Sequence, residues 1–156
     1  MEVSEIQEEF YAACDNENQW ENLRELVIKL KEENPDIVFE AIFGIFMNKS
    51  RPYSIYTDQY AAGGLLWKLK PKYNGNLRED IIRSFENWDL SIEELPWYFA
   101  EVAGKQRVCD ELKSIIKESL NDLHKTLAEG YLYFINRDQE YHRRRLNYYW
   151  DRELDE

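Results

Sequence analysis

Apolar residues recur at helical spacing along most of this chain, and no stretch alternates apolar and polar residues in the manner of a half-buried strand. The first helix is predicted to begin at Ser4, which can form a capping box with Gln7, and to end near Asp15. A second helix stops at Asn34 because the residue before a proline resists the helical conformation, and Pro35 can open the third. The pattern predicts an all-helical fold of about seven or eight helices.

The third and fourth predicted helices carry the most apolar part of the sequence. The third runs from Asp36 to about Asn48 and is apolar on most sides, so it should be deeply buried. A loop around Pro52 separates it from the fourth, which has Gly63 and Gly64 near its centre. Each glycine costs about 1 kcal/mol against alanine within a helix, so we expect a neighbouring helix to approach closely there. A phosphate-binding loop would require a preceding strand and GxxxxGK spacing, and the sequence has neither.

The second half of the sequence predicts further helices separated by caps and glycines. Asn76 can cap the fifth helix, Gly104 should end the sixth, and the seventh should run unbroken to Gly130. These helices and a C-terminal helical segment are expected over about 77–88, 92–103, 105–129 and 131–154. A single domain over 1–156 is expected, because a chain of 156 residues can bury most of its surface around one core.

The charge of this chain is strongly negative and unevenly distributed. The formal net charge is −11, and residues 1–40 hold 12 acidic side chains against 3 basic ones. Nucleic-acid binding relies on Lys and Arg that displace counterions, so this balance argues against a nucleic-acid partner. A basic protein partner would be attracted instead. An acidic surface that serves only solubility is the alternative.

Neither a secretory signal nor a membrane span is predicted. The N-terminal residues lack a basic start followed by an apolar run. The longest apolar run, over 36–47, is too short to cross a bilayer and contains Glu40. We therefore expect a cytoplasmic protein with no membrane contact. Cys14 and Cys109 are isolated and lack CxxC spacing, which favours two buried thiols over a disulfide framework or a zinc site.

The residues that could carry chemistry are few and scattered. His124 and His142 form no HExxH or His-x-x-x-His pair, so no metal site is predicted. Acidic residues are often adjacent, as at Glu93 and Glu94, but neighbouring positions on a helix point in different directions and normally form a solvated surface. No GxSxG sequence and no Cys-His dyad is visible. We predict neither catalysis nor a cofactor.

One region departs from the general acidity. Residues 141–150 combine Arg143, Arg144 and Arg145 with tyrosines and Trp150, a composition that can stack on single-stranded bases. The acidic side chains that follow can pair with these arginines or cancel their charge. A solvated or self-paired terminal helix, a protein contact and an RNA contact are all compatible with this composition.

The predicted partner-binding residues centre on three consecutive aromatics. Trp97, Tyr98 and Phe99 are not expected to face one core together, so Trp97 is a candidate interface anchor, with packing against the next helix pair as the alternative. Interfaces draw most of their binding energy from a few Trp, Tyr and Arg side chains ringed by polar residues. The candidates are all aromatic or acidic: Tyr56, Tyr60, Trp67, Asp89, Glu93, Glu94, Trp97 and Glu101.

Two helix pairs repeat a similar pattern. "DIVFEAIFGIFM" followed by "YAAGGLLWKLKP" parallels "DIIRSFENWDLSIEELPWYFAEVAGK", each an apolar helix, a turn and a helix that contains small residues. This pattern resembles HEAT-like repeats over about 36–117. The resemblance implies antiparallel helix pairs stacked into a right-handed solenoid, and a surface that holds other macromolecules. An irregular helical bundle is the alternative.

In general character the chain is also similar to small acidic bacterial immunity proteins, which neutralise a cognate toxin. The combined expectation is a protein that sequesters or inhibits a basic partner, most sharply a nuclease toxin, by blockade without chemistry. A helical scaffold or self-associating homo-oligomeric subunit is the second interpretation. A nucleic-acid-processing factor or enzyme that uses residues 141–150 is the third.

Overall fold

The computed structural model describes residues 1–137 and residue 140, and within them the chain forms eight helices and no strand. The all-helical class predicted from the sequence is confirmed. The helices are α1 (Val3–Cys14), α2 (Gln19–Leu30), α3 (Pro35–Ile45), α4 (Ile55–Leu69), α5 (Leu77–Ser84), α6 (Glu94–Ala103), α7 (Lys105–Glu118) and α8 (Asp122–Ile135). The terminal segment predicted over 131–154 enters the described region only through α8, and the arginine-rich stretch at 141–150 lies outside the described residues.

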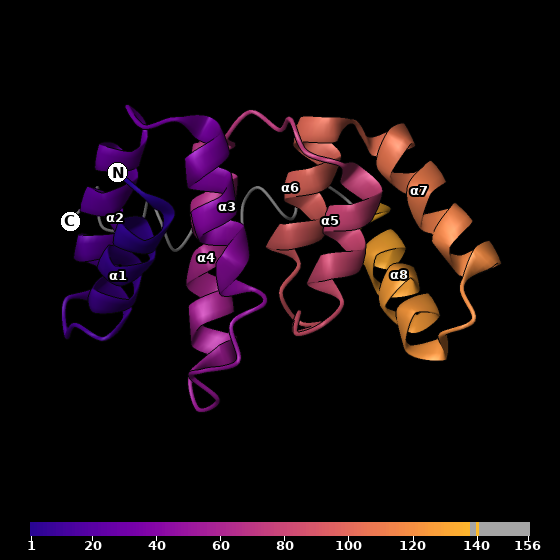
Figure 1. The fold of residues 1–156 in the computed structure, drawn as a ribbon, viewed down its shortest axis with the longest axis horizontal. Coiled ribbons are helices and arrows are strands. Elements are labelled where there is room, and N and C mark those ends of the chain that lie inside the picture. The colour runs from indigo at the N-terminus through magenta and orange to yellow at the C-terminus, as the bar shows by residue number, and fades with distance from the viewer. Residues whose placement is uncertain (138–139, 141–156) are drawn as a thin grey trace.

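The helices form an elongated array of antiparallel neighbours, with α1 and α2 at one end and α7 and α8 at the other (Figure 1). The odd-numbered helices α1 and α3 pack together, as do α5 and α7, and the even-numbered helices α2, α4, α6 and α8 pack in succession. The array therefore has two layers. A single hydrophobic cluster runs from Ile6 in α1 to Ile135 in α8, so every pair contributes to one continuous core.

The connections fall on two edges of the array. The turns within the pairs α1–α2, α3–α4, α5–α6 and α7–α8 all lie at the lower edge in Figure 1, whereas the links between pairs lie at the upper edge. We call the lower edge, formed by residues 15–18, 46–54, 85–93 and 119–121, the turn edge. The acidic residues 1–40 build α1, α2 and the start of α3, so the excess negative charge of the described chain lies towards one end.

Side-chain caps fix where several helices begin. Pro35 opens α3 and Asn76 caps α5 by accepting a hydrogen bond from a backbone N–H at 3.1 Å, both as predicted. Asn34 also caps α3, by accepting a hydrogen bond from a backbone N–H at 2.9 Å. The predicted cap at Ser4 is wrong. The capping residue lies two residues earlier, because Glu2 and the glutamate three residues later form the capping box instead.

The prediction of an unbroken helix over 105–129 is also wrong, because α7 ends before Ser119 and a new helix begins after the turn. Asn121 caps that helix by accepting a hydrogen bond from a backbone N–H of α8 at 3.1 Å. Gly130 lies inside α8 rather than after its end. A Cβ at Gly130 would lie 2.6 Å from the Cδ2 atom of Leu90, so the glycine lets α8 pack closely against the α5–α6 turn.

The three consecutive aromatics are all buried, but Tyr98 and Phe99 belong to the hydrophobic cluster whereas Trp97 lies outside it. Trp97, Tyr98 and Phe99 are 7%, 0% and 0% exposed, because α6 has neighbours on several sides. Tyr98 and Phe99 both contact the ring of Phe39 in α3, and the Tyr98 hydroxyl donates to the Pro71 carbonyl oxygen at 2.8 Å. A helix inside the array can therefore bury three successive side chains in different directions.

Gly63 has the close neighbour that its position in the sequence predicts. A Cβ at Gly63 would lie 2.8 Å from the Cβ atom of Glu94 and 3.3 Å from the Cγ2 atom of Ile92. These distances are shorter than carbon atoms normally tolerate, so only glycine allows α4 to approach the start of α6 this closely. The prediction of close helix approach at this glycine is confirmed.

Candidate protein-binding surface

The eight candidate residues come from α4, the α5–α6 turn and α6, and the structure divides them into groups. Trp67, Trp97 and Glu101 meet where α4 and α6 pack together, Glu93 and Glu94 lie at the start of α6, Tyr56 and Tyr60 lie in the first half of α4, and Asp89 lies in the α5–α6 turn. The candidates therefore do not form one continuous patch.

The Trp67 cluster comprises Trp67, Trp97, Lys70 and Glu101. The two indole rings meet edge to face with their centroids 6.1 Å apart. The Nζ atom of Lys70 lies 4.3 Å from the centroid of the Trp67 ring and 3.9 Å from the Glu101 carboxylate, so it makes a cation–π contact and an ion pair. The Nε1 atom of Trp97 donates to the carbonyl oxygen of Phe134 at 3.0 Å, which joins α6 to α8. Trp67 is half-buried and Glu101 is exposed.

The exposed role predicted for Glu93, Glu94 and Trp97 is not compatible with their burial. Glu94 is 4% exposed and carries the Cβ atom that packs against Gly63. Glu93 is also buried and forms an ion pair with Arg137 at 3.6 Å. The close approach of α4 and the packing of α8 enclose the start of α6. The candidates that keep exposed surface are Tyr56, Tyr60, Trp67, Asp89 and Glu101.

A second aromatic cluster lies across α2 and α4. The rings of Tyr56 and Tyr60, one helical turn apart, stack with their centroids 6.1 Å apart, and Trp20 of α2 meets Tyr60 edge to face at 6.0 Å. Tyr56 is exposed, whereas Tyr60 and Trp20 are half-buried. Aromatic pairs contribute about 0.5–1.5 kcal/mol beyond their buried area, so the two inner rings hold Tyr56 in place near the turn edge.

Hydrogen bonds from side chains to the backbone join the α3–α4 loop to the α5–α6 turn. Gln59, buried in α4, donates to the Asn87 carbonyl oxygen at 2.8 Å and accepts from the Asp89 N–H at 2.8 Å. Asn87 in turn donates to the Asn48 carbonyl oxygen at 3.1 Å. The Asp89 carboxylate accepts from the Ser91 N–H at 2.8 Å. These two turns are therefore held as one unit.

Arg51 fixes the α3–α4 loop to the end of α1. Its guanidinium donates to both oxygens of the Asp15 carboxylate, at 2.6 and 2.8 Å, and its Nε atom donates to the buried Asp58 carboxylate at 2.9 Å. The guanidinium also lies 4.7 Å from the centroid of the Tyr11 ring. Hydrogen bonds from Arg51 lower the pKa of Asp15 below its ordinary value, and hydrogen bonds to Asp15 and Asp58 raise the pKa of Arg51. This forked, charge-assisted contact anchors the base of the loop.

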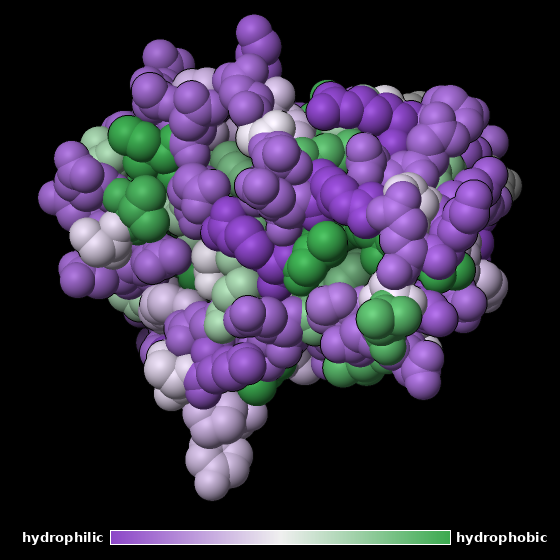
Figure 2. Space-filling model, turned by 45° about the vertical axis from the view of Figure 1, so that its right-hand side comes forward, coloured by the Kyte–Doolittle hydropathy of each residue, from purple (hydrophilic) through white to green (hydrophobic). Residues whose placement is uncertain are grey.

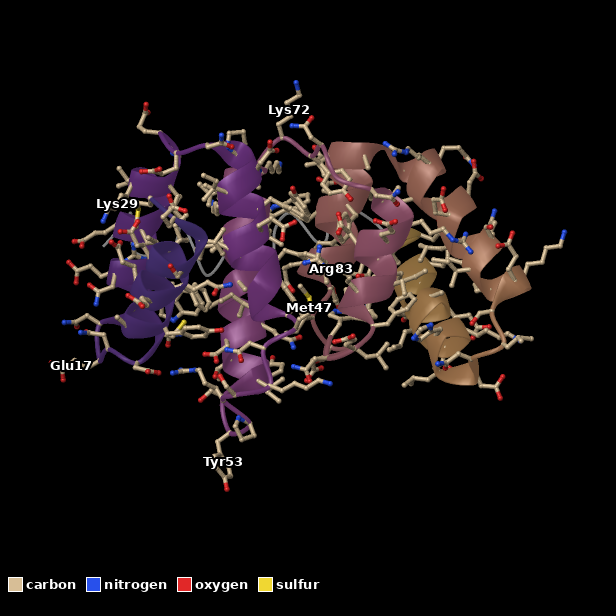
Figure 3. All side chains as sticks on the ribbon, viewed as in Figure 1. Glu17, Lys29, Met47, Tyr53, Lys72 and Arg83 are labelled. Carbon is tan, nitrogen blue, oxygen red and sulfur yellow. The ribbon has the colours of Figure 1, made fainter. Side chains whose placement is uncertain are left out.

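Tyr53 is fully exposed at the tip of this loop, and the sequence reasoning missed it. Its side chain points away from the array at the turn edge (Figure 3), and the loop forms a narrow projection below the rest of the surface in Figure 2. The sequence indicates a loop around Pro52, but a loop signal does not say which way a side chain points. Seven large hydrophobic residues are exposed in the described part of the chain: Ile28, Tyr53, Tyr56, Leu90, Leu120, Leu123 and Tyr133.

This chain matches no family model, no curated protein and no solved structure. Its function is therefore inferred from the residues and their geometry.

The remaining titratable candidates have packing contacts. The described residues contain no group of three or more His, Cys, Asp or Glu side chains placed to hold a metal ion. The ring of His124 contacts that of Phe85, with the centroids 5.3 Å apart. Both cysteines are free thiols; Cys109 is buried, and burial raises the pKa of the half-buried Cys14 to about 12.

Across residues 1–137, no helix is both long enough and apolar enough to cross a membrane.

Proposed function

We propose that this protein binds a basic protein partner and inhibits it by covering a functional surface, with no chemistry of its own. The observation that carries the proposal is the combination of a net charge of −11 with aromatic side chains that are exposed on or beside turns fixed by hydrogen bonds and ion pairs. Charge and exposed aromatics have complementary effects on binding: the first acts mainly on association and the second mainly on release.

The acidic end of the array supports fast association with a basic partner. Glu8, Glu21 and Glu25 are exposed side chains of α1 and α2, within the part of the chain where acidic residues exceed basic ones most strongly. Electrostatic steering of this kind raises association rates by about 10- to 1,000-fold at low ionic strength. Salt screens it, because the Debye length falls to about 8 Å at physiological ionic strength.

The exposed aromatic residues support slow release. Tyr56 keeps accessible surface while the neighbouring ring of Tyr60 holds it in position. Asp89, whose N–H donates to Gln59 of the same helix as Tyr56, keeps accessible surface as well. Aromatic anchors ringed by polar groups are typical of the residues that dominate binding energy at protein interfaces.

The sharpest form of the proposal is an immunity protein for a secreted nuclease toxin. A nuclease has a basic groove because its substrate is anionic, so an acidic protein can occupy or overhang that groove and block the substrate. Inhibition would then require binding alone.

Affinity capture tests the proposed function. The tagged chain is incubated with an extract of the cells that produce it, and the column is washed first at low and then at high salt. The proposal predicts one basic protein, retained at low salt in near-equal amount to the chain and toxic or enzymatically active when expressed alone. Retention of nucleic acid only, or of no protein at all, would contradict it.

A further inference from the structure

We infer that the partner docks on the turn edge, with Tyr53 as the central anchor, rather than on the Trp67 cluster. This inference rests on the proposed function, and it specifies which surface makes the contact and what chemistry the partner must present there. Three features of the turn edge carry it: the distribution of exposed apolar side chains, the rigidity of the loops and the local charge.

Exposed apolar side chains gather at the turn edge. Five of the seven large hydrophobic residues that are exposed in the described chain lie in the four turns or in the first turn of the following helix: Tyr53, Tyr56, Leu90, Leu120 and Leu123. The other two, Ile28 and Tyr133, lie on helices at opposite ends of the array (Figure 1). Exposed apolar residues scattered singly need no explanation, but a series along one edge indicates an interaction surface.

The loop that carries Tyr53 is fixed at both of its sides. Arg51 forms the forked contact with Asp15 described above, and the Ser54 N–H closes a tight turn by donating to the Arg51 carbonyl oxygen at 3.0 Å. Gln59 then ties the loop to the α5–α6 turn, donating to the Phe46 carbonyl oxygen at 3.5 Å as well as bonding across to that turn. The backbone that carries Tyr53 is therefore already ordered, so binding does not have to order the loop and more of the contact energy appears as affinity.

The charge around this loop defines the partner. Within the four turns, Asp15 pairs with Arg51 and Glu93 pairs with Arg137, which leaves Glu17, Glu86 and Asp89 against Lys49. Glu17 and Tyr53 lie on the same edge in Figure 3. The matching surface is a pocket that accepts one aromatic ring and is flanked by Lys or Arg, as expected of a basic protein.

The Trp67 cluster is a poorer anchor because its groups already satisfy one another. The Lys70 ammonium lies against the Trp67 ring and near the Glu101 carboxylate, so a basic side chain of the partner would have to displace a cation that the chain itself supplies. Displacement of that kind gains little net energy.

Two alanine variants test the docking surface. Tyr53→Ala should release the basic protein retained by the wild-type chain about 30-fold faster, in the range of interface anchors, with the unfolding temperature unchanged because the side chain is fully exposed. Tyr133→Ala is the matched control, since Tyr133 is 61% exposed on α8 and should change release less than about twofold. Equal release from the wild type and Tyr53→Ala would overturn the turn-edge inference and leave the proposed function standing. Absence of any retained basic protein would overturn both.

Photo-crosslinking gives an independent readout. A benzophenone amino acid is placed at position 53 or, as control, at position 133, and adducts are identified by mass spectrometry. The inference predicts an adduct between position 53 and a Lys- or Arg-rich peptide of the basic partner, and none from position 133. An adduct with a second copy of this chain, an adduct with nucleic acid, or equal adducts from both positions would each overturn it.

Discussion

Replacing Gly63 with alanine should destabilise the fold, although alanine favours helices. In a helix interior the exchange gains about 1 kcal/mol of helix propensity. Against that gain, the added Cβ would lie 2.8 Å from the Cβ atom of Glu94 and 3.3 Å from the Cγ2 atom of Ile92. The first of these atoms is bonded directly to the α6 backbone, so side-chain rotation cannot move it away. The two helices must separate.

The expected loss follows from these distances. Carbon atoms pack best at about 3.5–4.0 Å, so α4 and α6 must move apart by roughly 0.7–1.2 Å at this point. Overpacking of a well-packed core costs typically about 1–3 kcal/mol, and this contact lies beside the fully buried Leu65 and Leu95, which favours the upper end. After the propensity gain, the net loss of unfolding free energy should be about 2 kcal/mol. For a chain of this length that lowers the melting temperature by about 4–8 °C.

Urea denaturation followed by circular dichroism measures this loss, with Gly130→Ala as the matched control. Both glycines lie inside helices, but the nearest neighbour of a Cβ at Gly130 is the terminal Cδ2 atom of Leu90, at 2.6 Å, which can rotate aside. The control should stay within about 1 kcal/mol of the wild type. A Gly63→Ala chain as stable as the wild type would refute the reasoning that this glycine exists for close helix packing.

Three further predictions concern single contacts. Cys14 should resist alkylation near neutral pH in the folded chain and react in urea, because burial raises its pKa to about 12; rapid labelling of the folded chain, read by peptide mapping, would contradict this. Tyr98→Phe should cost about 1–2 kcal/mol of unfolding free energy in urea, because the buried Pro71 carbonyl loses its donor, and unchanged stability would argue against that bond. Hydrogen bonds from Arg51 lower the pKa of Asp15 below its ordinary value of 3.8, so the ionised carboxylate stabilises the fold. The wild type should therefore be more stable than Asp15→Asn above pH 3.8, and this difference should disappear as the pH falls through the lowered pKa of Asp15. Melting curves of the two chains across this range test the last point, and a difference independent of pH would refute it.

The sequence predicted the elements whose signals are local. Asn34 followed by Pro35 and the cap at Asn76 each act within one helical turn, so their positions could be read directly. The break between α7 and α8 was missed because apolar residues keep helical spacing across it, and Asn121 alone marks the new start. The burial of three successive aromatics in α6 could not be predicted either, because it depends on how many neighbours surround that helix.

The sequence indicates the chemical type of the surface side chains but not their positions. Composition indicates acidic and aromatic character, and Tyr56 and Asp89 do lie at or next to the turn edge. The sequence suggests that Glu93 and Glu94 are exposed, but α4 and α8 pack closely around them and bury them. No local sequence pattern indicates that packing. The loop that carries Tyr53 is anchored by the contact of Arg51 with Asp15, which is distant in the sequence. Such long-range contacts determine exposure, and a single sequence does not display them.

The association rate of the purified chain with its basic partner, measured by stopped-flow at increasing salt, tests the central claim most directly. The account predicts that the association rate constant falls steeply with salt while the dissociation rate changes little, and that neutralising Glu8, Glu21 and Glu25 to Gln lowers the rate at low salt. Neutralising Lys105, Lys113 and Lys117, exposed on α7, provides the matched control and should not lower it. An association rate that does not depend on salt, or that responds equally to both sets of changes, would contradict binding guided by the acidic surface.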